Sequence, residues 1–145
     1  MADTTLAQLE FLNKRANAVI TTFDILEREL QEWVKLRTIS DREFLSIKKK
    51  LMDSIDNYFG YLDILNRALA PDSAVAELIK REVNTENLEA ERRRWVKVIM
   101  TINTLKANDL KAFIAEMKNI IKKVKSGLGF LQSGLVRAIL ARKAA

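Results

Sequence analysis

The sequence predicts an all-α protein, an antiparallel up-down-up-down four-helix bundle built from long helices. Apolar residues recur at alternating steps of three and four along four stretches of about thirty residues each, which is the spacing of a helix-packing seam. The chain has one proline and four glycines in 145 residues, so few positions interrupt a helix. Because 48% of the residues are hydrophobic, residues 1–145 can bury a core as a single domain.

The first helix is expected to begin at Thr5, which can form a capping box with Gln8, and to run to about Arg37. Its apolar positions never leave the three-four spacing. They are Leu9, Leu12, Ala16, Val19, Phe23, Leu26, Leu30 and Trp33.

The second helix has a clear start and a clear end. Ser40 and Glu43 have the spacing of a capping box, in which each residue satisfies an exposed amide of the other. Pro71 disfavours helical geometry at the residue before it, so the helix should end at residues 68–70. Its apolar positions are Phe44, Ile47, Leu51, Ile55, Tyr58, Leu62, Leu65 and Leu69.

The third helix, capped by Asp72 or Ser73, has polar residues in the middle of its stripe. Two interpretations fit: one helix over residues 73–106, or a short and a long helix separated by a break near Asn84. The break is favoured, because asparagine is poor inside a helix and good at its N-terminus.

The fourth segment, residues 108–145, is basic and apolar and starts at Asn108-Asp109. Gly127 is expected to end or kink this helix, giving a second break near Gly127. The apolar stripe continues beyond it through Leu128, Leu131, Leu135 and Ile139.

The composition predicts a protein that is not an enzyme. The chain has no histidine and no cysteine, which removes the commonest general base, the commonest metal ligand and the thiolate nucleophile. It also has no glycine-rich phosphate loop. No catalytic residue, cofactor, metal or small-molecule substrate is therefore expected.

No signal peptide and no transmembrane helix are expected. The most apolar stretch, residues 127–141, is interrupted by Gln132, Ser133 and Arg137. The protein is expected in the cytoplasm or within a particle such as a virion.

The positive charge is concentrated in the last third of the chain. The net charge is +6, and residues 101–145 hold nine basic side chains against two acidic ones. Such a surface can bind nucleic-acid phosphates without sequence preference, whereas the alternative is a face that only keeps the protein soluble. The candidates are a stripe on the last helix and a cluster on the third: Lys111, Lys118, Lys122 and Lys125, then Arg92, Arg93, Arg94 and Lys97.

The C-terminal segment also predicts a contact between copies of the chain. Phe130, Val136 and Leu140 lie outside the main stripe, and exposed apolar groups commonly mark an interface. Gly129 and Gly134 begin pairs of small residues that let helices approach closely.

The functional prediction is a self-associating structural subunit, coat-like or filament-like, that also contacts nucleic acid. One alternative is an adaptor or chaperone that binds a partner protein's amphipathic helix. A less favoured alternative is a peripheral protein of the membrane surface. Secretion chaperones, apolipoprotein-like bundles and viral coat proteins share this helical texture, and no motif distinguishes among them.

Overall fold

The structure of the chain, a computed structural model, describes residues 4–69, 73–82 and 88–144. These residues form five α-helices and one short 3-10 helix and contain no β-strand, which confirms the all-α prediction. The elements are α1 (Thr4–Trp33), α2 (Asp41–Ala68), α3 (Ala74–Glu82), α4 (Leu88–Thr104), η1 (Ala107–Asp109) and α5 (Leu110–Ala144).

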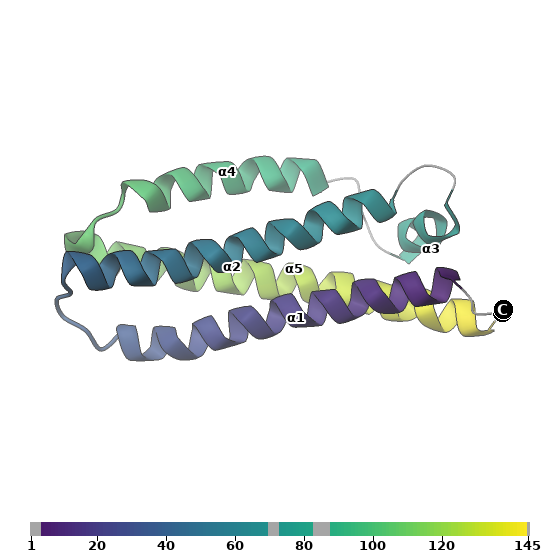
Figure 1. The fold of residues 1–145 in the computed structure, drawn as a ribbon, viewed down its shortest axis with the longest axis horizontal. Coiled ribbons are helices and arrows are strands. Elements are labelled where there is room, and N and C mark those ends of the chain that lie inside the picture. The colour runs from purple at the N-terminus through teal and green to yellow at the C-terminus, as the bar shows by residue number, and fades with distance from the viewer. Residues whose placement is uncertain (1–3, 70–72, 83–87, 145) are drawn as a thin grey trace.

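The four longest helices lie side by side, and the short α3 sits at the end of the molecule where the chain terminates (Figure 1). Helix α1 packs most extensively against α5 and next against α2, while α3 packs against α5 and α1. The main neighbour of α4 is α2. The all-α class is therefore confirmed, but the predicted up-down-up-down four-helix bundle is not, because the described residues form five helices and α4 and α5 are not among the main contacting pairs.

The predicted stripes form the core. All of the predicted stripe residues of α1 from Leu9 to Leu30 are buried. Trp33 is half-buried, and the Lys50 ammonium lies 5.7 Å from its ring centre. Phe44 of α2 meets Phe113 of α5 edge to face, with 5.0 Å between ring centres. This geometry places the positive edge of one ring against the negative face of the other.

The predicted start of α2 is confirmed by its hydrogen bonds. The backbone N–H of Glu43 donates to Ser40 Oγ at 3.1 Å, and the Ser40 hydroxyl donates to Glu43 Oε1 at 3.0 Å. Ser73 caps α3 in the same manner, accepting from the Ala76 N–H at 3.0 Å. In both cases a side-chain oxygen satisfies an amide that has no partner inside the helix.

The predicted C-terminal limit of α1 is wrong. Its predicted start lies one residue from the first described helical residue, Thr4, and Thr5 is buried within the first turn. The helix ends at Trp33 and not near Arg37, because the apolar stripe has no further position to bury. The backbone there changes to a tighter turn with 3-10 hydrogen bonding, in which the Leu36 N–H donates to the Trp33 carbonyl at 3.0 Å.

The predicted break near Asn84 falls between α3, which ends at Glu82, and α4, which begins at Leu88; Asn84 itself lies outside the described residues. The end of α3 is held against α5 by Arg137. The Arg137 guanidinium donates to the Glu82 carboxylate at 3.0 Å and to the Glu82 carbonyl at 2.9 Å. It therefore binds both a charged side chain and a backbone carbonyl at the C-terminus of α3.

Helix α4 is fixed to α2 at two places. Trp95 packs edge to face against Tyr58 with 5.6 Å between ring centres. At the other end, Lys48 Nζ donates to the carbonyls of Asn103 and Leu105 at 3.0 and 3.3 Å. A cation at these carbonyls is favourable, because the C-terminus of a helix carries partial negative charge.

The break expected near Gly127 is wrong, since α5 runs without interruption from Leu110 to Ala144. One glycine inside a helix costs only about 1 kcal/mol relative to alanine. Burial of Leu128 beside it offsets more than that, since a fully buried leucine contributes about 1.5–3 kcal/mol. The apolar stripe on both sides of Gly127 therefore decides the local structure.

Replacing Gly127 by alanine should raise the free energy of unfolding by about 0.5–1 kcal/mol, because alanine restricts the unfolded chain and favours helix. A β-carbon at Gly127 would meet nothing within 4 Å, and the same holds at Gly60 in the middle of α2. Urea denaturation of Gly127→Ala and of the matched control Gly60→Ala should give similar gains. A loss at Gly127 beside a gain at Gly60 would show that residue 127 leaves helical geometry in solution.

Candidate functional site

A groove separates α4 from α5, and the sequence of α5 explains why. The flank of α5 that faces α4 carries Glu116, Asn119 and Lys123 at steps of three and four, so this side offers no continuous apolar seam. Helix α4 consequently packs on α2 and leaves a cavity of about 580 Å³ beside α5. Its lining residues are Arg94, Trp95, Val98, Glu116, Asn119, Ile120, Lys122, Lys123, Ser126, Gly127 and Phe130.

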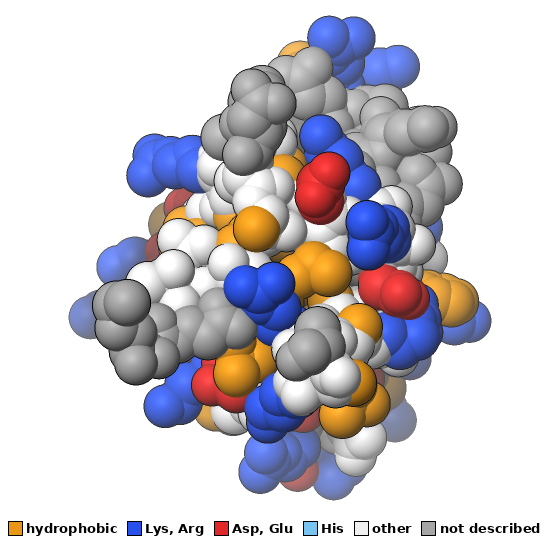
Figure 2. Space-filling view, turned by 90° about the vertical axis from the view of Figure 1, so that its right-hand side faces the viewer, with side chains coloured by type: hydrophobic (Ala, Val, Ile, Leu, Met, Phe, Trp, Pro, Cys, Tyr) orange, Lys and Arg blue, Asp and Glu red, His pale blue; other side chains and the backbone are white. Residues whose placement is uncertain are grey.

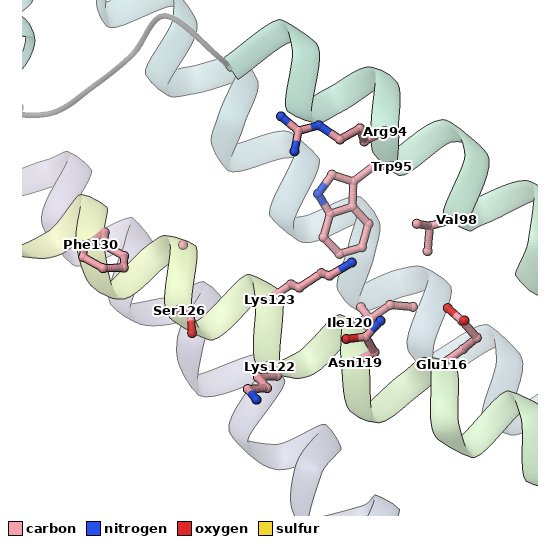
Figure 3. Close-up of a pocket in the computed structure, with 11 residues that line it drawn as sticks. Arg94, Trp95, Val98, Glu116, Asn119, Ile120, Lys122, Lys123, Ser126 and Phe130 are labelled. Atoms are coloured by element: carbon pink, nitrogen blue, oxygen red, sulfur yellow. The ribbon is translucent and has the colours of Figure 1, made fainter.

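The base of the groove is apolar. Trp95 and Ile120 are buried there, Val98 is half-buried, and Phe130 stands at one end with 82% of its surface exposed. In Figure 3, Trp95 points from α4 toward α5, and Lys123 extends from α5 toward α4. The lining runs along α5 from residue 116 to residue 130, about 21 Å at 1.5 Å per residue.

The rim of the groove is basic. Arg94, Lys122 and Lys123 line it together with a single carboxylate, that of Glu116. All three basic side chains are exposed, and none of them is in an ion pair with a residue that the structure describes. The groove therefore combines an apolar base with basic side chains that form no ion pair among the residues that the structure describes.

Three of the four predicted stripe lysines are available to a partner. Lys111, Lys118 and Lys122 are exposed on α5 and form no ion pair within the described part of the chain. Lys118 borders a second hollow, which also includes Glu27 of α1. The stripe therefore lies beside acidic side chains, which reduce its positive potential.

Lys125, the fourth stripe lysine, is already bound within the chain. Its ammonium lies 2.6 Å from Asp24 Oδ1 and 3.4 Å from Glu27 Oε1, both on α1. The hydrogen bond to Asp24 raises the pKa of Lys125, partial burial lowers it, and Glu27 raises it again, with a net increase. This residue joins α1 to α5 and is the least suited of the four to bind an external anion.

The residues of the second predicted basic cluster lie on different sides of helix α4. Arg94 faces the groove, and Arg93 and Lys97 are exposed. Arg92 lies in α4, but its side chain is outside the described part of the structure. The structure brings Arg94 together with Lys122, which the sequence had placed in separate clusters.

The predicted self-association residues divide between surface and core. Phe130, Leu140 and Val136 are exposed by 82%, 61% and 42% of their surface. Gly129 lines a shallow hollow between α1 and α5 that also contains Val136. Gly134 is buried on the inner face of α5, where another copy of the chain cannot reach it, because it follows the core stripe.

Of the residues that line the groove, the sequence identified Arg94, Lys122 and Phe130 as candidates and missed the others. Lys123 is one of those missed, because its position falls outside the arc of the lysine stripe. The available signal was the run of polar side chains at helical spacing on one flank of an otherwise apolar helix. This run indicates a groove only when it is known which helix faces that flank, and the fold is needed to know this.

Basic side chains are spread over much of the molecular end at which α3 and the C-terminus lie, whereas acidic side chains form only small areas there (Figure 2). Across the described ranges, no group of three or more acidic, histidine or cysteine side chains could hold a metal ion. No helix in the same ranges has the length and apolarity needed to cross a membrane. Comparisons with protein families, with characterised proteins and with solved structures find no match to this chain.

Replacing Lys125 by methionine should lower the free energy of unfolding by about 0.5 kcal/mol, since the ion pairs are partly exposed to solvent. Because folding raises the pKa of Lys125 above its ordinary value of 10.5, the contribution is present in full below pH 10.5. It is lost as the pH rises through the higher pKa of the folded state.

The measurement is urea denaturation of both proteins from pH 7 to pH 11.5. Burial, with a smaller effect of Tyr58, also raises the pKa of Tyr61, but this residue is common to both proteins and cancels in the difference. A difference in stability that stays constant to the highest pH would contradict the proposed role of the Lys125 ion pairs.

Proposed function

We propose that the protein is a non-enzymatic structural subunit, a helical bundle that associates with copies of itself in a coat-like or filament-like assembly. The observation that supports this most directly is the exposure of Phe130, at 82% of its surface, on a helix that has already buried a full apolar face. Leaving such a ring in water is unfavourable, and a contact between copies would remove it.

The neighbouring surface of α5 favours the same contact. Leu140 is 61% exposed, and Val136 borders the hollow with Gly129, where a β-carbon would meet nothing within 4 Å. Two copies related by a twofold axis would bring the same surface together twice, so one apolar patch is enough for a dimer, from which a larger assembly would grow through a further contact.

Light scattering over a concentration series should reveal oligomers of the parent chain that Phe130→Asp and Leu140→Asp dissolve, while circular dichroism shows unchanged helix content. The control is Leu45→Asp on α2, because Leu45 is 62% exposed and distant in sequence from α5. A parent chain that stays monomeric at high concentration would defeat the proposal. If Leu45→Asp dissolved the oligomers equally well, the association would be due to exposed apolar residues in general and not to the surface of α5.

We also propose contact with nucleic-acid phosphates through Lys111, Lys118 and Lys122, which are exposed on one side of α5. Lys125 is left out, because Asp24 and Glu27 neutralise it. Such binding adds affinity without reading a sequence, since phosphates are the same at every base pair.

Gel shifts with duplex DNA of random sequence should show binding that falls with salt at a log-log slope of about −3, as expected for three phosphate contacts. Lys118→Gln with Lys122→Gln should weaken binding by about tenfold at 50 mM salt. The exposed pair Lys49→Gln with Lys80→Gln changes the net charge equally and should have little effect. An absence of binding at low salt would remove this proposal.

A further inference from the structure

The groove between α4 and α5 shares Phe130 with the proposed contact between copies and Lys122 with the proposed phosphate stripe, but its apolar base and the rim residues Arg94 and Lys123 belong to neither. We propose that it binds an acidic amphipathic helix of a different protein, with the apolar side of that helix against Val98 and Phe130 and its carboxylates against Arg94, Lys122 and Lys123.

The packing of α4 provides the space. Helix α4 is fixed to α2 through Trp95 and through the two carbonyls that Lys48 binds. Among the described residues no comparable set of contacts joins α4 to α5, and the cavity of about 580 Å³ lies along this edge. A groove about 21 Å long matches roughly four helical turns.

The two parts of the groove select the same type of ligand. Its apolar base requires an apolar stripe on the ligand, and its rim requires negative charge beside that stripe. A helix with apolar residues at positions i, i+3, i+4 and i+7 and with acidic neighbours supplies both. Exposed Phe130 would serve as the anchor, because large aromatic side chains dominate the energy of such contacts.

Charge distinguishes this ligand from a second copy of the chain and from a nucleic acid. The chain has a net charge of +6, so a second copy brings further positive charge to a basic rim. Phosphates bind through hydrogen-bond donors and water, and the aliphatic side chains of Ile120 and Val98 at the base offer neither, whereas they can bury an apolar side chain. An acidic helix satisfies the base and the rim together.

The test uses a fluorescent amphipathic peptide of about 15 residues, long enough to span the groove, with leucine at the helical positions and glutamate beside them. Anisotropy at 150 mM salt should show saturable binding to the full chain. A peptide of the same composition in scrambled order should bind at least about tenfold more weakly, because it presents no apolar stripe.

The groove variant combines Arg94→Glu with Lys123→Glu. It should weaken peptide binding at least about tenfold, because the new glutamates repel the peptide. The matched control, Lys111→Glu with Lys118→Glu, makes the same change in net charge on the lysine stripe outside the groove. It should weaken binding less than about twofold.

Trp95 provides a local signal. In a Trp33→Phe background Trp95 is the single tryptophan, and its emission should change and saturate at the same peptide concentration as the anisotropy. This signal belongs to the groove, and Leu140→Asp, a change outside the groove, should leave it unaltered, which separates this inference from self-association.

Three outcomes would overturn the inference: no saturable binding of the peptide, equal binding of the scrambled peptide, or equal losses in the groove variant and its control. If duplex DNA or phosphatidylglycerol vesicles bind, the peptide does not, and only the groove variant loses that binding, then the groove recognises phosphate and the proposal is wrong.

Discussion

The pairing of α1 with α5 is the contact on which the rest of the molecule depends. No other pair of helices packs together as extensively, and both helices bury large side chains completely, among them Phe23 of α1 and Phe113 and Met117 of α5. Each such side chain contributes about 1.5–3 kcal/mol when it leaves water, far more than any surface ion pair in the structure. Helix α2 and α3 then cover the remaining apolar sides of this pair.

This pairing also determines where the unusual surfaces lie. A helix of 35 residues has more than one side, and α5 gives its apolar face to α1 and α3. The side of α5 that faces α4 carries polar residues such as Asn119 and Lys123. The side of α5 that faces solvent includes Phe130. The groove and the exposed ring thus have one cause, since both lie on the sides of α5 that the core does not use.

The sequence was sufficient to predict the long helices and their buried faces, but not to predict which polar side chains of different helices contact each other. Helical spacing predicted the buried positions of α1 and α5, and local hydrogen-bonding chemistry predicted the cap at Ser40. Propensity misled at Gly127, because burial on both sides outweighs the cost of one glycine. The partners of Lys125 lie about a hundred residues away in the chain, and no local pattern indicates which helix will face a given flank.

The same pairing has a consequence for synthesis on the ribosome. Helix α1 is made before α5, so the most extensive contact between helices cannot form until the residues of α5 have emerged. Contacts between residues far apart in sequence slow folding, and unburied apolar stripes expose a nascent chain to aggregation. Until α5 emerges, α2 is the main partner of α1, so the apolar side that α1 later gives to α5 stays open to other surfaces.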